Sequence, residues 1–232
     1  MKIFGFIISA SLFIANLSFG QAEIALHPDS VKGKFIPTGI RIGTEVINIG
    51  RTLSKSDLTE VTFTADVDFN RYYLNMEFGT YDRSFEDQVG SLYSVSGNYF
   101  RIGPDINFLK NDQDGNMLFF GFRYGWTSIN DELTYMNTGA AFDNETRSIG
   151  NNGLSANWGE MVTGLRVKIW KMLWLGYTAR FRFGSDNFEG SELIPHYVPG
   201  YGRADKTVSW GLNYWVMVRL PLRTPPKILF DK

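Results

Sequence analysis

The residues that could carry out catalysis are few, because the chain has 2 histidines and no cysteine. His196 lies in "ELIPHYVPGYG", close behind Ser191 and Glu192. A hydroxyl is a weak nucleophile without an adjacent base, so a serine, a histidine and an acid are the residue types that hydrolysis would need. A loop histidine packed against Tyr197 or Tyr201 accounts for the same residues without catalysis. We therefore expect no enzymatic activity and no catalytic residue.

Two short motifs have the composition of ligand sites. "NDQDGN" (111–116) has the acids and glycine of a calcium loop but lacks the distal glutamate of the EF-hand pattern, so a solvated turn is the better interpretation. "PGYGRAD" (199–205) has two glycines and no following helix, which is a weak pattern for a phosphate cradle. The sequence has no zinc-ligand spacing. We expect no metal site and no cofactor.

A larger set of charged residues alternates with apolar ones. In "GLRVKIWKMLWLGYTARFRFG" (164–184) the cations Arg166 and Lys168 are two apart, and so are Arg180 and Arg182. A period of two places charged side chains on one face of a β-strand and apolar side chains on the other. The same alternation along the chain collects a polar face made of Arg41, Glu45, Asp66, Asp68, Glu77, Arg101, Asp105, Arg123, Glu160, Arg166, Lys168, Arg180, Arg182 and Arg219.

This polar face contains both acids and bases, so its members can neutralise one another. A buried charge without a partner costs several kcal/mol, and buried charges persist mainly when they are paired. We predict that the cations near 166–168 and 180–182 pair with acids from the opposite wall, namely Asp66, Asp68, Glu77 and Asp105. The interpretation is a structural network in a lumen. A narrow polar channel or a ligand cavity is the alternative.

Eight segments show the alternation that positions these side chains. They are 37–50, 60–69, 72–81, 99–109, 116–128, a sixth strand that begins near Glu160, 173–183 and 207–220. Pro104 has no backbone N–H for a strand ladder and predicts a bulge in the fourth strand. An even number of antiparallel strands can close into a barrel without a free edge. The predicted fold is an all-β, eight-stranded antiparallel up-and-down barrel that covers residues 37–222.

The connections between these strands alternate in length. The long ones are 51–59, 82–98, 129–156 and 184–206, and the short ones are 70–71, 110–116 and 170–172. Short periplasmic turns and longer external loops are typical of outer-membrane barrels. The apolar faces would then contact outer-membrane lipid. A soluble, lipocalin-like periplasmic barrel is the alternative, and it would bury Leu165, Val167 and Phe181 inside and expose the arginines.

The two ends of the chain differ from the barrel in composition. Residues 1–20 combine Lys2, an apolar run and small residues before Gln21, which predicts a cleaved signal peptide. Residues 21–36 are polar and are interpreted as a periplasmic lead-in. The C-terminal tail, 223–232, contains Pro225 and Pro226 and cannot continue a strand ladder.

Overall composition supports strands and excludes one class of partner. Aromatic residues make up 16% of the chain and there are 24 glycines, a combination that favours strands joined by tight turns. Lys plus Arg number 23 against 24 Asp plus Glu, and the basic residues are scattered. A nucleic-acid-binding protein would show a basic patch, so no nucleic-acid partner is expected.

Several stretches give the chain a resemblance to a known family. They are "FIPTGIRIGTEV", "ADVDFNRYYLNMEFG", "GNYFRIGPDINFL", "MLFFGFRYG", "ANWGEMVTGLRVKIWKMLWLGYTARFRF" and "VPGYGRADKTVSWGLNYWVMVRLPLR". In their texture and order they are similar to exported proteins of Bacteroidetes-type bacteria, the domain of unknown function family 6048. The resemblance implies an outer-membrane β-barrel and assigns no catalytic or binding residue.

The expected function is a non-enzymatic outer-membrane barrel with a structural or partner-binding role. Loops 129–156 and 184–206 are rich in aromatic and polar residues, so they either bind a surface ligand or protein or fold over the mouth of the barrel. A narrow pore, a small-ligand transport barrel and a soluble binding barrel are the alternatives. The sequence leaves the oligomeric state open.

Overall fold

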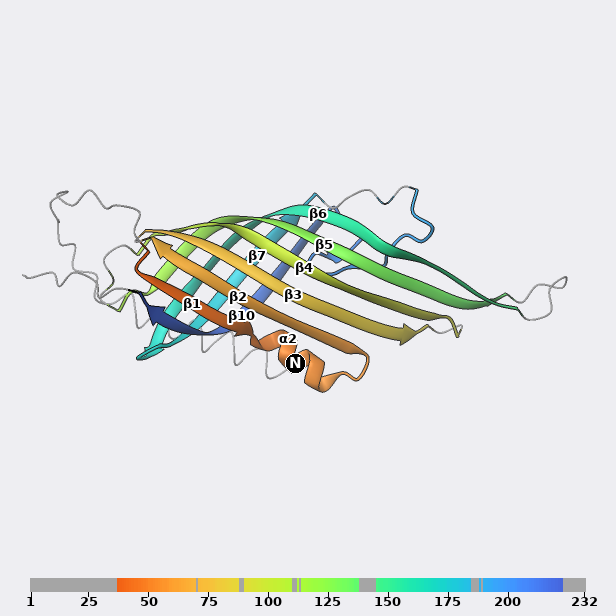
Figure 1. The fold of residues 1–232 in the computed structure, drawn as a ribbon, viewed down its shortest axis with the longest axis horizontal. Helices are drawn as coiled ribbons and strands as arrows, with labels where there is room; N and C mark the ends of the chain where they lie inside the picture. The colour runs from red at the N-terminus through yellow and green to blue at the C-terminus, as the bar shows by residue number, and fades with distance from the viewer. Residues whose placement is uncertain are drawn as a thin grey trace, which may run out of the picture. The chain divides into compact units, whose positions relative to one another are not determined.

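The computed structural model describes residues 37–69, 71–87, 90–109, 112, 114–137, 145–184, 188 and 190–222. Within them eight antiparallel strands close into a barrel, in the order β1-β10-β7-β6-β5-β4-β3-β2 (Figure 1). The predicted eight-stranded barrel is therefore confirmed. The strands are β1 (Gly39–Glu45), β2 (Leu58–Phe69), β3 (Tyr72–Glu86), β4 (Leu92–Asn107), β5 (Met117–Asn137), β6 (Glu145–Trp170), β7 (Leu173–Phe183) and β10 (Val208–Pro221).

The two ends of the barrel differ. At one end, which we call the turn end, β2 joins β3 through residues 70–71 and β6 joins β7 through Lys171 and Met172. At the other, the loop end, β3 to β6 run past their neighbours, with β5 and β6 reaching furthest (Figure 1). The predicted long connections 82–98 and 129–156 are mostly strand. The asymmetry lies largely in strand length, and the prediction of long loops there was wrong.

The reason is visible along β3. Its outward side chains are apolar up to Phe78, and then Thr80, Asp82 and Ser84 follow on the same face. Inward, the buried side chain changes from Glu77 to Tyr81. The alternation continues, but the apolar side chains move from the outer face to the inner one. The sequence prediction assumed one continuous apolar face. It therefore ended the strand where the apolar side chains change from one face to the other.

The first strand is shorter than predicted. β1 ends at Glu45 and is followed by helix α2 (Val46–Ser54), so the predicted strand over 37–50 is wrong beyond residue 45. Both Glu45 carboxylate oxygens accept backbone N–H bonds, from Ile47 (3.2 Å) and Asn48 (2.5 Å), and such an N-cap starts a helix. No helix within the described ranges is long and apolar enough to cross a membrane.

Because β1 stops early, β2 and β10 continue beyond it without a strand between them. β1 pairs with β10 only as far as Trp215 and with β2 only as far as Phe63. Side chains occupy part of the exposed edges: Thr52 of α2 donates to the Glu60 carbonyl (3.1 Å) and accepts from the Glu60 N–H (2.8 Å). The Tyr214 N–H donates to Glu45 (3.1 Å). A helix thus covers the notch that the missing strand leaves.

The loop end is closed by a cap segment, residues 190–206, with the short hairpin β8 (Tyr197–Val198) and β9 (Gly202–Arg203). Tyr197 stacks on Tyr81 with ring centroids 4.5 Å apart, and Tyr201 packs against Trp158 at 5.8 Å. The buried apolar cluster beneath it contains Leu58, Tyr81, Tyr93, Val95, Tyr99, Ile129, Ala156, Trp158, Phe188, Val198 and Tyr201. Of the two outcomes left open for loop 184–206, its described part folds over the barrel mouth.

Local details fit a crowded interior. A Cβ on Gly79 would overlap the Tyr99 ring, and one on Gly125 would overlap Trp158, so these inward glycines make room for large rings. The bulge predicted at Pro104 is absent, because the residues on either side of it keep one register with both β3 and β5. Register shifts occur instead near Ile129 and near Lys168.

Candidate functional site

The polar face predicted from the sequence points into the barrel. Of its 14 members, the eleven that are buried are Arg41, Glu45, Asp66, Asp68, Glu77, Arg101, Asp105, Arg123, Glu160, Arg166 and Arg180. Arg182 and Arg219 are partly buried. Glu45 is bound by three backbone N–H groups and makes no ion pair within 4.0 Å among the described residues. Apart from Asp68, the remaining buried charges of this face form two clusters along the barrel.

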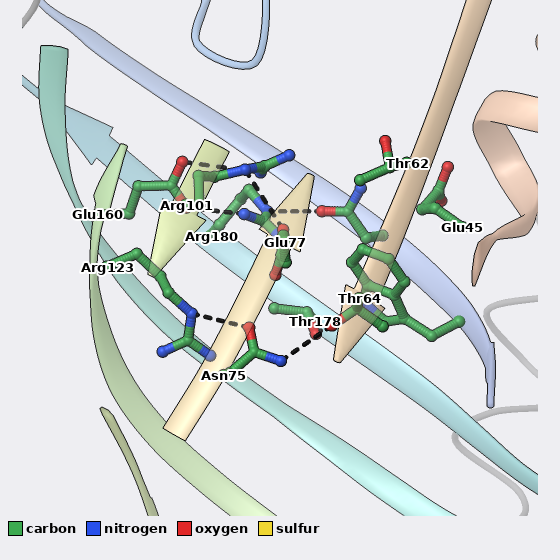
Figure 2. Close-up of polar contacts among 12 residues, drawn as sticks. Glu45, Thr62, Thr64, Asn75, Glu77, Arg101, Arg123, Glu160, Thr178 and Arg180 are labelled. Carbon is green, nitrogen blue, oxygen red and sulfur yellow. Dashed lines mark hydrogen bonds and ion pairs between the residues drawn. The ribbon is translucent and has the colours of Figure 1, made fainter. Parts of the chain in front are cut away.

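The loop-side ion cluster joins Arg101, Arg180, Arg182, Glu77 and Glu160. Arg180 on β7 contacts Glu160 on β6 at 2.7 Å and spans the lumen to both oxygens of Glu77 on β3 at 3.1 Å. Figure 2 shows Arg101 and Arg180 directed at these two acids. Arg101 lies 3.3 Å from Glu77 and 3.7 Å from Glu160. Three guanidinium groups thus share two carboxylates.

The turn-side ion cluster joins Arg41, Arg123, Arg166, Asp66 and Asp105. Asp66 accepts from Arg41 (2.8 Å) and from Arg166 (2.7 Å), which come from β1 and β6. Asp105 accepts from Arg123 (2.8 Å) and from Arg166 (3.4 Å). Contacts between distant strands tie the walls together, and carboxylates shared between guanidinium groups are among the stronger hydrogen-bonded pairs.

The turn-end rim holds a third ion pair and also Lys168, which was predicted to lie in the network. Asp68 pairs with Arg219 of β10 at 2.8 Å. Lys168, predicted as part of the network, is exposed and makes no ion pair within the described ranges, so that prediction was wrong. The register shift after Lys168 ends the inward row at the rim, where water can solvate an ammonium group.

Neutral side chains that sequence reasoning missed complete the network. Asn75 accepts from Arg123 (3.1 Å) and donates to Thr64 (2.9 Å) (Figure 2). Asn213 accepts from Arg180 (2.5 Å). Aromatic rings also stack on guanidinium groups: the guanidinium carbon of Arg41 lies 4.8 Å from the Tyr73 ring centroid, a cation–π contact. The signal was available, because each of these residues occupies an inward position of the same period-two pattern.

The residues with catalytic potential, His196 and Ser191, lie in the cap segment. Each of them contacts neighbouring aromatic rings or backbone carbonyls. The His196 ring packs edge-on against Phe85 and Tyr93, with centroids 6.1 and 6.2 Å away. The Ser191 hydroxyl lies 2.8 and 2.9 Å from the carbonyls of Phe188 and Leu193. Burial raises the pKa of the Tyr93 phenol, which contacts Asp131. The ring contacts of His196 hold the cap segment against the strands beneath it.

No group of three histidine or acidic residues that could hold a metal occurs in the described part of the chain. In the 111–116 motif, Asp112 accepts N–H bonds from Asp114 (3.0 Å) and Asn116 (2.8 Å), the pattern of a turn. Residues 111 and 113 of that motif lie outside the described residues, as do residues 1–36 and 223–232. The signal-peptide, lead-in and tail predictions therefore stay predictions.

Comparison with known families gives a match over nearly the whole chain. The model of DUF6048, a domain of unknown function, matches residues 3–224. The chain belongs to the DUF6048 family. None of the curated proteins compared with this DUF6048 chain matches it significantly.

Two solved structures are similar to the DUF6048 chain. One is Ail, the attachment invasion locus protein of Yersinia pestis, in complex with the heparin analogue sucrose octasulfate, with 13% identity, a TM-score of 0.38 and coverage of 79% of this chain and 98% of that one. The other is Neisserial surface protein A, with 8% identity, a TM-score of 0.37 and coverage of 80% and 95%. The assignment of an eight-stranded barrel is based on the strand pairing within this chain and not on these two similarities.

Proposed function

We propose that this DUF6048 protein is a non-enzymatic β-barrel of the outer membrane with a structural or partner-binding role. The observation that carries the proposal is the distribution of polarity around the ring. Arg180 is fully buried inside, whereas the neighbouring Phe181 is 43% exposed on the outer face. Phe63, Phe78 and Phe122 are exposed in the same way on β2, β3 and β5. An outer band of aromatic and aliphatic side chains is stable against lipid and unfavourable against water.

The same side chains argue against the soluble, lipocalin-like alternative. A water-soluble barrel would bury Leu165, Val167 and Phe181 inside and expose its arginines, which is the reverse of the observed arrangement. The pore alternative requires a water-filled lumen. Arg180 instead reaches across the lumen to Glu77, and Arg101 and Arg180 both contact Glu160. A filled interior supports a scaffold role.

The part of the molecule available for partner binding is the projecting sheet of β3 to β6 with its cap segment. Its outward side chains are polar, among them Ser94, Ser96, Asn130 and Glu132, which line a shallow depression of about 370 Å³. A rigid sheet that presents polar groups is suited to surface ligands or proteins. In this proposal the turn end faces the periplasm, and residues 1–20 direct export.

Membrane fractionation tests the location. After carbonate washing of envelopes, the protein is expected in the integral-membrane fraction, with its mature N-terminus near Gln21. Release with the soluble periplasmic proteins would contradict the membrane location. Planar-bilayer measurements of the refolded protein separately test the scaffold role, because a filled lumen predicts no stable single-channel conductance.

A further inference from the structure

A polar cavity of about 240 Å³ lies at the loop end beside the loop-side ion cluster. It lies between helix α2, strands β2, β4, β7 and β10, and the cap segment, and three arginines line it: Arg51, Arg101 and Arg182. No family description assigns it a role. It is also separate from the shallow outer depression on β4 to β6, with which it shares no lining residue.

The cavity lies at the notch that β1 leaves. Its lining includes residues 209–213 of β10, the stretch that has no β1 partner. The most exposed lining residues are Trp210 at 75%, Arg51 at 43% and Leu212 at 39%. Trp210 and Leu212 belong to the outward apolar face of β10. The opening is therefore on the side wall, between α2 and β10, next to apolar surface.

Beside the cavity, guanidinium groups of the loop-side ion cluster have unused donors. Arg101 is 2% exposed, and its Nε and Nη1 atoms make no hydrogen bond although Glu77 and Glu160 lie 3.3 and 3.7 Å away. Arg182 Nε is likewise without a hydrogen bond, 3.5 Å from Glu160. These buried donors face the two acids, so the donor that an incoming acceptor can reach is Arg182 Nη2, which lies beside Gly211 in the cavity lining and makes no hydrogen bond within the described residues.

The direct ion pairs beside the cavity contain more arginines than acids. Arg101, Arg180 and Arg182 share only Glu77 and Glu160. Two further acids lie nearby but are already satisfied. Glu60 pairs with Arg51 at 3.1 Å, and Glu45 accepts three backbone N–H bonds. One positive charge of the loop-side cluster is left without a carboxylate of its own.

We propose that this side-wall cavity binds the phosphate group of an anionic lipid headgroup. Guanidinium groups recognise tetrahedral phosphate oxygens through several directed N–H bonds. Gly211 keeps space for this, because a Cβ there would lie 3.0 Å from Arg182 Nη2. A lipid would place its phosphate beside Arg51 and Arg182 and its acyl chains along Trp210 and Leu212. The lipid source rests on the proposed membrane location, and a free phosphate would share the same recognition chemistry.

The test uses the full mature chain refolded in a maltoside detergent. Isothermal titration with dihexanoylphosphatidylglycerol is expected to show saturable binding, with dihexanoylphosphatidylcholine and inorganic phosphate as parallel probes. Gly211→Leu, which fills the cavity, and Arg51→Gln, which removes a charge at its exposed rim, are each expected to weaken binding at least tenfold. Arg203→Gln is the matched control, because Arg203 pairs with Asp205 in the cap segment away from the cavity lining.

The outcomes separate the possibilities. Preferential binding of the anionic lipid supports the lipid source, and equal binding of inorganic phosphate supports the site with a free anion as ligand. Absence of saturable binding by any probe, or binding that neither variant weakens, would overturn the proposal. Arg51→Gln keeps the test decisive if Gly211→Leu does not fold. Because titration in detergent does not depend on membrane location, its result is independent of the carbonate fractionation.

Discussion

The barrel wall has two parts: a lower part towards the turn end and an upper part towards the loop end. The two parts have opposite polarity although the same strands build them. On β3, Phe78 faces outward beside the inward Glu77, whereas a few residues later Ser84 faces outward and Tyr81 inward. In the lower part the interior contains the ion clusters together with small apolar clusters, such as Trp174, Trp215 and Met217. In the upper part it is the aromatic cluster beneath the cap segment. Backbone pairing is continuous through both. The solvent outside each part, lipid below and water above in the proposed location, decides which face is apolar.

The largest expected effect comes from opening the lower interior. Glu77→Ala removes the acid that Arg180 and Arg101 share, and it leaves buried guanidinium groups without a partner. We expect a loss of about 3–5 kcal/mol in the free energy of unfolding. Urea titration of the refolded barrel in detergent measures it.

Asp68→Ala is the comparison for that variant. Its partner Arg219 sits at the turn-end rim with 28% of its side chain exposed, so water can replace the lost contact. The expected cost is about 1 kcal/mol. A loss of only about 1 kcal/mol for Glu77→Ala as well would show that water fills the lumen.

A matched pair on the outer face sharpens the contrast between the two parts. Phe78→Arg and Ser84→Arg add the same side chain to the same face of β3, below and above the change of polarity. In lipid bilayers the first should cost about 2–4 kcal/mol, because it exposes a charge to hydrocarbon. The second should stay within about 0.5 kcal/mol. Similar costs at both sites would contradict a lipid boundary between them.

The upper interior can be tested by pH. Burial raises the pKa of the Tyr93 phenol in the folded protein, so its stabilising contribution is complete below the ordinary value of about 10 and is lost as pH rises above it. Tyr93→Phe removes this titration along with the contacts to Asp131 and the His196 N–H. We expect the variant to lose about 1 kcal/mol at neutral pH. Its unfolding free energy should also depend less on pH above about 10, as urea titrations at several alkaline pH values would show.

The smallest effect is expected at Lys168. The side chain is exposed at the turn end and makes no ion pair among the described residues. Lys168→Ala should therefore change the free energy of unfolding by less than about 0.5 kcal/mol. A loss of several kcal/mol in the same urea titration would show that Lys168 enters the lumen in solution.

The sequence predicted those strand segments in which the period-two alternation continues and the same face stays apolar throughout. The alternation around Arg166 and Arg180 identified the strands and the inward charges, because outward-facing and lumen-facing positions differ sharply in polarity. The strand extensions around Tyr93 and Ile129 were missed because the apolar face changes sides there. Helix α2 was missed because Val46 and Ile47 are β-branched and continue the strand composition, while the deciding contact is the Glu45 cap. The side-wall cavity was missed because its lining comes from α2, β2, β4, β7, β10 and the cap segment, which are far apart in the sequence.

Glu45 links events at opposite ends of the chain. Its carboxylate caps helix α2 and also accepts the Tyr214 N–H, 169 positions later in sequence. The contact to Tyr214 exists only once β10 has come alongside β1, since residue 214 belongs to the last strand of the ring. Docking of α2 is therefore coupled to the final step of assembly. A barrel caught before closure should have a loose N-terminal helix that is open to proteases, so cleavage after Arg51 would report how far folding has progressed.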